Sequence, residues 1–394
     1  RVLPRKQILK QIIDVLNKHR DEAGIIYCLR RKDVDSISSN LKNLGIDNVS
    51  YHAGMSDKER YIAQERFARE EVNIIVATIA FGMGIDRSNI RFIIHTGMPK
   101  SIEHYQQETG RAGRDGLLAS CYLFYGGGDY QLWSFFAEKS SEREVLIEKL
   151  RSMYNFCTQP QCRHRVLVNY FNQSYNKHSC CACDYCLNEL EMVDNALVIG
   201  QKVLSCVTDV RYEHYGFGAG YVTDVLKGKL TEKIKYAGHH NLSVFGTMQE
   251  ESEPFIRYMI EQLTGQGFLS KEREFSTLLV TDTGKQLLNG ELLPMLAKPL
   301  LRTKKKETTK KSREKREIEW SGVDQELFQI LREKRTELAK KKGVPAYIIF
   351  GDKPLRDMAA KKPLTKEAFS GIYGVGENKL KSYADIFIKI IRDY

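Results

Sequence analysis

Two arginines three positions apart are the side chains in this sequence best suited to chemistry. Arg111 and Arg114 lie in the segment Gln-Glu-Thr-Gly-Arg-Ala-Gly-Arg-Asp-Gly, residues 107–116, just after a predicted strand and a short helix. Arginine stays charged and its planar fork matches phosphate oxygens, while the neighbouring glycines let the backbone approach a ligand or another domain. Such a pair suits an arginine finger, which stabilises charge on a transferring phosphoryl group from across an interface. The alternative is a loop with two solvated surface arginines.

Four cysteines have the spacing of a metal site. They follow the pattern C-x17-C-x2-C-x2-C and are Cys162, Cys180, Cys183 and Cys186. Thiolates two residues apart can reach one tetrahedral zinc ion, and four of them close its coordination shell, so the predicted site is structural. His178 and Cys181 are the alternative ligands. The remaining cysteines lie in apolar contexts and are predicted to be core residues: Cys28, Cys121, Cys157 and Cys206.

The elements that would position the arginines alternate between strand-like and helix-like segments over residues 1–130. Such alternation is typical of a parallel sheet with helices on both faces. Ligands bind such sheets at the carboxyl ends of the strands, so the loops at 53–55, 82–84 and 110–111 are expected to line one edge. The predicted strands are 24–29, 49–52, 73–81, 90–96 and 119–125, and the predicted helices are 33–44 and the segment from the N-cap Ser56 to about residue 70.

The rest of the chain divides by composition. Residues 131–195 are predicted to be a helical module that contains the cysteine cluster, and residues 196–295 to mix helices with a hairpin at 268–281. A basic linker is expected at 296–320 and a compact helical domain at 321–394. Two further expectations concern single segments: the glycine run 126–128 is predicted to be a flexible linker, and the pair His239 and His240 to be polar surface.

The bulk composition favours a nucleic-acid partner and excludes several classes of protein. The 394 residues are 42% hydrophobic and carry a formal net charge of +11, which points to a polyanion rather than to disorder. Residues 302–316 alone hold nine basic residues against two acidic ones. No apolar run approaches the roughly 18 residues that span a bilayer, and no secretory signal opens the sequence. Nine cysteines without such a signal indicate reduced thiols and a cytoplasmic location.

The chain resembles the RecQ family of DNA helicases over nearly its whole length. Residues 77–86 and 107–116 are similar to the last two helicase motifs of that family, and 27–30 and 51–54 to its substrate-contact segments. The cysteine spacing resembles its zinc module, and the C-terminal segment its HRDC domain. The winged-helix domain of the family is resembled by residues 217–220 and 238–243. The implied fold is an α/β RecA-like lobe with a parallel sheet, a helical zinc-binding module, a winged-helix domain and a small all-α HRDC domain.

The resemblance also implies roles at the nucleotide. ATP and Mg²⁺ would lie between two lobes, with Arg111 and Arg114 reaching the β- and γ-phosphates. Asp86 and Gly84 would contact the nucleotide, and Gln107 would orient groups in the cleft. A glutamine that only hydrogen-bonds its own loop is the alternative for Gln107.

Other residues would contact DNA. Thr78, His52 and the amides near Gly54 would hold the DNA backbone, and Arg273 lies in the turn of the predicted wing. A wing that separates strands and a plain wing that packs or touches phosphate both remain open. The hairpin between two helices of the last domain would present its amides and a cation to phosphate through Gly374, Gly376 and Lys379.

The implied function is an ATP-dependent 3′-5′ DNA helicase that acts in DNA repair and recombination, including the SOS response. Expected partners are single-stranded DNA, duplex or forked DNA and a single-strand-binding protein, for a monomer in the bacterial cytoplasm and nucleoid. The sequence lacks a G-x-x-x-x-G-K-[ST] loop and an Asp-Glu box. We therefore expect a second lobe with accessory domains of a longer protein, inactive by itself as an ATPase. The alternative is a non-enzymatic zinc and winged-helix DNA-binding protein or regulator.

Overall fold

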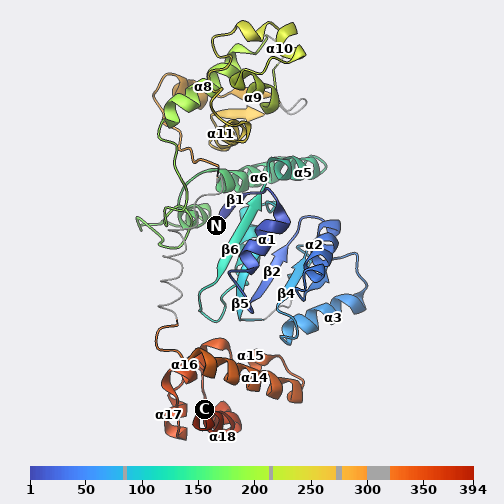
Figure 1. Ribbon diagram of the computed structural model, residues 1–394, viewed down its shortest axis with the longest axis vertical. Coiled ribbons are helices and arrows are strands. Elements are labelled where there is room, and N and C mark those ends of the chain that lie inside the picture. Colours follow the sequence, from blue (N-terminus) through green and yellow to red (C-terminus); the bar gives the residue numbers. More distant parts are fainter. Residues whose placement is uncertain (83–86, 213–215, 272–276, 300–319) are drawn as a thin grey trace.

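Six short apolar segments pair into one parallel sheet at the centre of the molecule (Figure 1). The computed structural model describes residues 1–82, 87–212, 216–271, 277–299 and 320–394. The strand order is β1-β6-β5-β2-β4-β3, so the central β2 is hydrogen-bonded to β5 and β4. Both faces of β2, β4 and β5 are buried, which explains why these strands are continuously apolar. The strands are β1 (Val2–Pro4), β2 (Ala23–Tyr27), β3 (Val49–Tyr51), β4 (Ile74–Ala77), β5 (Ile90–His95) and β6 (Ser120–Tyr125).

Helices cover both faces of this sheet, as the alternating pattern predicts. On one face α1 (Ile8–Leu16) and α2 (Arg31–Asn43) pack their apolar residues against Ile26 and Ile94. On the other face α3 (Asp57–Ala68) packs Phe67 against Ile25 and Ile93. The predicted N-cap of α3 is confirmed, because the Ser56 side chain accepts from the Glu59 amide in a capping box. We call residues 1–125 the lobe.

The glycine run at 126–128 is not a linker, and that prediction is wrong. Gly127 begins α5 (Gly127–Ala137), and Gly126 is its N-cap residue. The reason is the Asp129 side chain, which accepts hydrogen bonds from the amides of Gly126 (2.9 Å) and Met98 (3.0 Å) and pairs with Arg5 at 2.7 Å. An acidic residue at this position favours a helix start more strongly than three glycines oppose it. The expected domain boundary at 130/131 therefore falls within a helix.

After α5 the chain forms two more helices, α6 and α7, and then a small domain of helices and one hairpin. Helix α6 (Arg143–Thr158) lies between the lobe and the later domain, and Gln159 just beyond it donates to the Gly265 carbonyl at 3.2 Å. The hairpin expected at 268–281 is confirmed as the antiparallel pair β7 and β8, and its turn at 272–276 lies outside the described residues. The elements from the zinc module onward are α7 (Arg163–Tyr170), α8 (Ala196–Asp209), α9 (Ala219–Lys227), α10 (Glu232–Tyr236), η1 (His239–Asn241), α11 (Glu253–Gly265), β7 (Leu269–Lys271), β8 (Leu278–Val280) and α12 (Asp282–Leu288).

His239 belongs to the core of this domain, which contradicts its predicted place on the surface. Only 4% of the residue is exposed, and its Nδ1 lies 2.7 Å from the Tyr221 hydroxyl. Tyr212 stacks on the imidazole at 5.4 Å. Burial lowers the pKa of His239, so the neutral ring is the form that packs here. His240 is exposed as expected.

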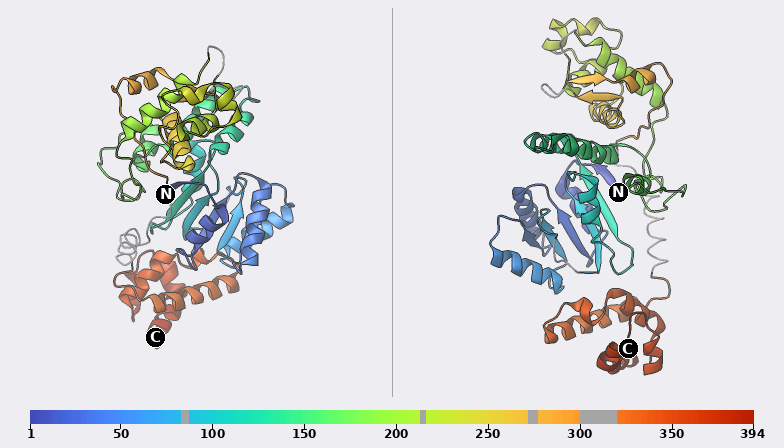
Figure 2. Two further views of the ribbon diagram at one scale, coloured as in Figure 1. Left: turned by 45° about the horizontal axis from the view of Figure 1, so that its top comes forward. Right: turned by 180° about the vertical axis from the view of Figure 1, so that it is seen from behind.

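The C-terminal residues form a separate helical domain with its own core. Its buried residues include Leu331, Phe350 and Phe387, which come from different parts of the domain. Most of the predicted basic linker, residues 300–319, lies outside the described residues. Figures 1 and 2 show the lobe between the domain built from α8–α12 at one end and this helical domain at the other. Its helices are α14 (Gln325–Lys342), α15 (Ala346–Ile349), α16 (Asp352–Lys361), α17 (Lys366–Ser370) and α18 (Glu377–Asp393).

Candidate functional site

The carboxyl ends of β2, β4 and β5 gather the residues that surround Arg111. Its guanidinium lies against Gly82, where an added Cβ would meet Nη2 at 3.1 Å. Glycine at position 82 therefore leaves the room that the arginine occupies. Tyr27, the last residue of β2, also lies near Arg111, and its hydroxyl donates to the Phe81 carbonyl at 3.1 Å. Burial raises the pKa of Tyr27, and the positive charge of Arg111 acts against that rise. We call Tyr27, Gly82, Glu108 and Arg111 the arginine edge.

The two predicted arginines differ in their surroundings. Arg111 is half-buried, and its Nε is buried with no hydrogen-bond partner among the described residues. Arg114 is exposed, with Nε 3.4 Å from the Gly110 carbonyl oxygen. Gly113 separates them in the left-handed conformation (φ +67°), where a Cβ would lie 2.8 Å from the Leu117 carbonyl. A glycine is required there, because a side chain would meet both a strained φ and a clash.

The residues that follow Arg111 lie at the amino end of β5, opposite the carboxyl ends of the strands. The Gly113 amide donates to the carbonyl of Ile90, the first residue of β5, at 2.9 Å. Asp115 pairs with Arg91, and both side chains are more than nine-tenths buried. The arginine motif is therefore fixed at its far end by a buried ion pair.

Glu108, beside the predicted Gln107, is the buried acidic residue of this motif. In α4 (Ile102–Thr109) the Gln107 side chain is exposed, whereas Glu108 turns inward. Its Oε2 lies 2.7 Å from Nε2 of His95, and that imidazole stacks on Tyr27 at 5.4 Å. Sequence reasoning missed both His95 and Glu108. Two sequence features could have indicated them: His95 is a polar residue at the end of a buried apolar strand, and Glu108 is an acidic residue directly after Gln107.

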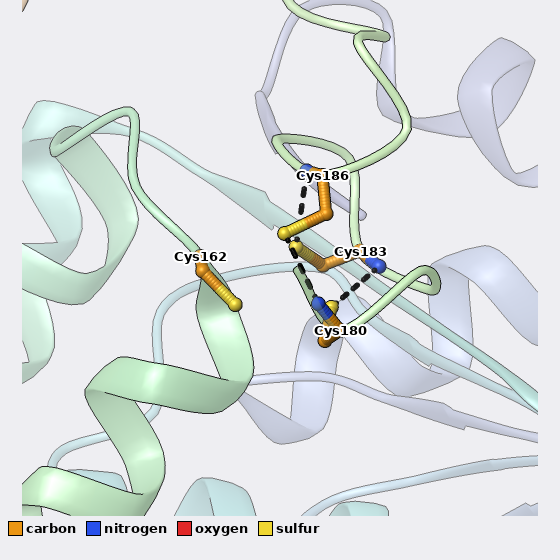
Figure 3. A group of neighbouring side chains, drawn as sticks. All are labelled: Cys162, Cys180, Cys183 and Cys186. Atoms are coloured by element: carbon orange, nitrogen blue, oxygen red, sulfur yellow. Dashed lines mark hydrogen bonds between the residues drawn. The ribbon is translucent and has the colours of Figure 1, made fainter. Parts of the chain in front are cut away.

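The four predicted cysteines converge as expected (Figure 3). The Sγ atoms of Cys162, Cys180, Cys183 and Cys186 all lie within 4.8 Å of one another. Three backbone amides donate to sulfur: Cys180 to Cys186 at 3.4 Å, Cys183 to Cys180 at 3.3 Å and Cys186 to Cys183 at 3.4 Å. Amides aimed at sulfur favour the thiolate that binds a metal. This donor set and spacing fit a closed tetrahedral zinc shell.

The two alternative ligands stay outside the cluster. His178 is exposed, and Cys181 is exposed in a left-handed conformation (φ 51°) with its Sγ 3.6 Å from the Ser179 hydroxyl. The module is fixed to the rest of the molecule by a buried pair that sequence reasoning did not find. Arg163 donates to Asp184 at 2.9 Å, and Asp184 accepts the Val2 amide of β1 at 2.9 Å.

Comparisons with known proteins follow the same order along the chain. Four family models match: helicase conserved C-terminal domain (residues 5–116), RecQ zinc-binding (127–187), RQC domain (193–305) and HRDC domain (324–391). The ATP-dependent DNA helicase RecQ of Pasteurella multocida is 37% identical over 391 residues, which are 98% of this chain. The chain belongs to the RecQ family.

Other RecQ proteins agree in extent. The chain is 37% identical to ATP-dependent DNA helicase RecQ of Haemophilus influenzae over 98% of its length, and 34% identical to that of Bacillus subtilis over 97%. It spans 60% to 62% of the length of these relatives. The resemblance to the RecQ family and the predicted order of domains are both confirmed. The four cysteines are a structural zinc site of the RecQ type. Within the described residues no helix is both long and apolar enough to cross a membrane.

The predicted DNA-contacting residues of this RecQ chain lie in separate places. Thr78 is buried at the end of β4, and its amide donates to the Tyr51 carbonyl at 3.1 Å. Both ring nitrogens of His52 are engaged, Nε2 with Asp35 at 3.0 Å and Nδ1 with the amide of the exposed Gly54 at 3.1 Å. His52 therefore shapes its loop. Three predicted site residues lie outside the described residues: Gly84, Asp86 and Arg273.

The three predicted contacts in the HRDC domain form a group of their own. Gly374 is exposed with φ +71°, and the exposed Gly376 is the N-cap residue of α18. Lys379 is half-buried, and its ammonium lies 5.1 Å from the centre of the Phe350 ring. Burial lowers the pKa of Lys379. Of the three residues, the two glycines are exposed, whereas the Lys379 ammonium packs toward the core of the domain.

Proposed function

We propose that this chain is the second RecA-like lobe and the accessory domains of an ATP-dependent DNA helicase. The observation that carries the proposal is the arginine edge. Arg111 lies against Gly82 and near Tyr27, the last residue of β2, and its buried Nε has no hydrogen-bond partner among the described residues. A held guanidinium at the ligand edge of a parallel sheet suits phosphate better than a solvated surface arginine does.

The phosphates would be held by another RecA-like lobe, because no G-x-x-x-x-G-K-[ST] loop occurs in the sequence. ATP with Mg²⁺ supplies the phosphoryl group when bound there. Arg111 and Arg114 stabilise its developing charge across the interface, an effect worth about 10³ to 10⁵ in turnover in other phosphoryl-transfer proteins. Gln107, exposed on α4, faces solvent in position to orient groups at the same interface. Gly84 and Asp86 are proposed nucleotide contacts by resemblance.

DNA is the proposed macromolecular partner, in single-stranded and in duplex or forked form. The net charge of +11 and the exposed backbone at Gly54, Gly374 and Gly376 support phosphate contacts. Thr78, His52, Arg273 and Lys379 are proposed at the same interface. The 3′-5′ polarity, the role in repair, recombination and the SOS response, a single-strand-binding partner, a monomeric state and a place in the bacterial cytoplasm and nucleoid are carried over from the family as part of this proposal.

The test uses the helicase with both lobes and the variant Arg114→Ala. We expect the DNA-stimulated ATPase rate to fall by about 10³ or more, with the dissociation constant for single-stranded DNA unchanged. Arg69→Ala is the matched control, since Arg69 is a partly exposed arginine outside this edge that pairs with Glu65 at 2.7 Å. Near-normal turnover in Arg114→Ala would contradict the arginine-finger assignment and favour a purely DNA-binding protein.

A further inference from the structure

One acidic residue of the lobe accepts an arginine from the HRDC domain. Nη2 of Arg335, on α14, lies 2.6 Å from Oε2 of Glu70, which follows α3. Nη1 of the same arginine lies 2.7 Å from Asp352 and 3.1 Å from the Phe350 carbonyl, both within the HRDC domain. The Arg335 side chain is 1% exposed and that of Glu70 is 5% exposed. The contact joins residues 265 positions apart.

Glu70 is also held by residues of the lobe. Its other carboxylate oxygen, Oε1, accepts from Asn89 at 3.2 Å, and Asn89 in turn accepts from Arg87 at 2.9 Å. The buried Arg87 also donates to the Phe67 and Val72 carbonyls, each at 2.8 Å. This network belongs to the lobe alone and presents one carboxylate oxygen outward.

The backbone at Glu70 has the conformation that often follows a helix, but glutamate is an unusual residue for it. Its φ is +61°, a left-handed conformation that usually falls to glycine or asparagine after a helix. A glutamate there costs about 1 kcal/mol or more. The observed use of this carboxylate is to receive Arg335, which gives the strain a structural purpose.

Charges on both sides of the contact alternate in sign. Burial acts to raise the pKa of Asp352, but Arg335, Arg332 and the lobe residue Arg91 outweigh it and hold that pKa below its usual value. Lys353 extends the contact, because its Nζ is 3.9 Å from the position that a Cβ on Gly116 would take. The HRDC domain thus rests on the amino-terminal edge of the sheet, beside Asp115 and Gly116.

We propose that this edge is a docking surface for the HRDC domain, closed by insertion of Arg335 against Glu70 and opened by salt. The contacts described between the two domains are charged or polar: Arg335 with Glu70, and Lys353 beside Gly116. Salt favours the open form because it screens the separated, solvated charges, as the screening length falls from about 14 Å at 50 mM to about 4 Å at 500 mM. A domain held in this way can dock and release without disturbing either hydrophobic core. The inference does not depend on the proposed helicase activity.

Small-angle X-ray scattering of the whole chain tests the docking. We expect the radius of gyration of the wild type to be small at 50 mM NaCl and to rise by 500 mM NaCl. Glu70→Arg places two guanidinium groups against each other, so this variant should have the larger radius already at 50 mM. Glu71→Arg is the control, because Glu71 is the adjacent residue and pairs with Arg66 within the lobe.

Arg335→Gln tests the same contact from the other side. This change also removes a partner of Asp352, so circular dichroism must first show native helix content. If the HRDC domain unfolds in Arg335→Gln, Glu70→Arg alone decides the question. Equal radii for wild type and Glu70→Arg at 50 mM NaCl, or a wild type already expanded at that salt, would overturn the proposal.

Discussion

Glu108 and His95 share a buried hydrogen bond of 2.7 Å directly beneath the arginine motif. The histidine ends β5 and the glutamate lies one turn before Arg111, so the bond joins the sheet to the end of α4. The His95 ring also stacks on Tyr27 at 5.4 Å and makes a tilted contact with Tyr105 at 5.2 Å. The direction in which the motif leaves α4 is therefore set by the core of the lobe.

Replacement of Glu108 should destabilise the lobe. In Glu108→Ala the buried Nε2 of His95 loses its partner, and Nδ1 already has none among the described residues. We expect a loss of about 1 to 3 kcal/mol in the free energy of unfolding, measured by urea denaturation. Glu65→Ala, which removes an exposed ion pair with Arg69, should cost no more than about 0.5 kcal/mol. Equal effects of the two changes would contradict the structural role of Glu108.

Tyr27→Phe tests whether Tyr27 positions Arg111 for catalysis, apart from its contribution to the stability of the lobe. The change removes one hydrogen bond, to the Phe81 carbonyl, and should cost about 1 kcal/mol in unfolding free energy. In the helicase with both lobes we expect a larger fall in the ATPase kcat than in DNA affinity, because Arg111 loses its neighbour. Tyr61→Phe is the matched control, as that tyrosine is 65% exposed. An unchanged kcat would exclude a positioning role for Tyr27.

The cysteine cluster offers its own internal control. Cys183→Ser removes one of four converging ligands, whereas Cys181→Ser changes an exposed thiol outside the cluster. We expect Cys183→Ser to lose bound zinc, measured by elemental analysis, and to melt at a lower temperature. Cys181→Ser should keep a full equivalent of zinc. Zinc loss in the second variant would mean that Cys181 is a ligand in solution.

Glu261 predicts an unusual dependence of stability on pH. This residue of α11 lies near Gly127 of α5, and burial raises its pKa above the usual carboxyl value. A raised carboxyl pKa lowers stability as pH rises through the ordinary carboxyl range, because the folded state must then bury the charge. Glu261→Gln should therefore melt at a higher temperature than wild type at pH 8, and the difference should vanish near pH 4.

The control for this pH effect is Glu250→Gln, an exposed residue of the same domain. Its melting temperature should follow the wild type at both pH values. A Glu261→Gln variant less stable than wild type at pH 8 would show that the Glu261 carboxylate has a favourable partner.

The sequence alone predicted five of the six strands of the sheet, helices α2 and α3 and the zinc ligands, whereas β1 was not predicted. Continuous apolar runs marked β2, β4 and β5, and Ser56 with Glu59 marked the start of α3. The spacing of Cys180, Cys183 and Cys186 predicted three neighbouring ligands, and the structure brings the fourth predicted ligand, Cys162, to them and leaves His178 and Cys181 outside. Apart from Cys162, the partners are either near in sequence or repeated at a regular interval.

The errors and omissions all involve partners distant in sequence. Gly126 begins a helix because Asp129 also bonds to Met98 and Arg5, and His239 is buried because Tyr212 and Tyr221 enclose it. The pairs of His95 with Glu108 and of Glu70 with Arg335 appear only once strands and domains are assembled. No periodicity or spacing rule brings such residues together.

Residues 108–113 connect the two ends of β5. Glu108 is bonded to His95, the last residue of that strand, and Gly113 to Ile90, its first. Arg111 stands between these two anchors with its guanidinium against Gly82, and Asp115, paired with Arg91, precedes the Gly116 that Lys353 approaches. One short segment, anchored repeatedly on a single strand, would thus be shared by a nucleotide at Arg111 and the HRDC domain at Gly116.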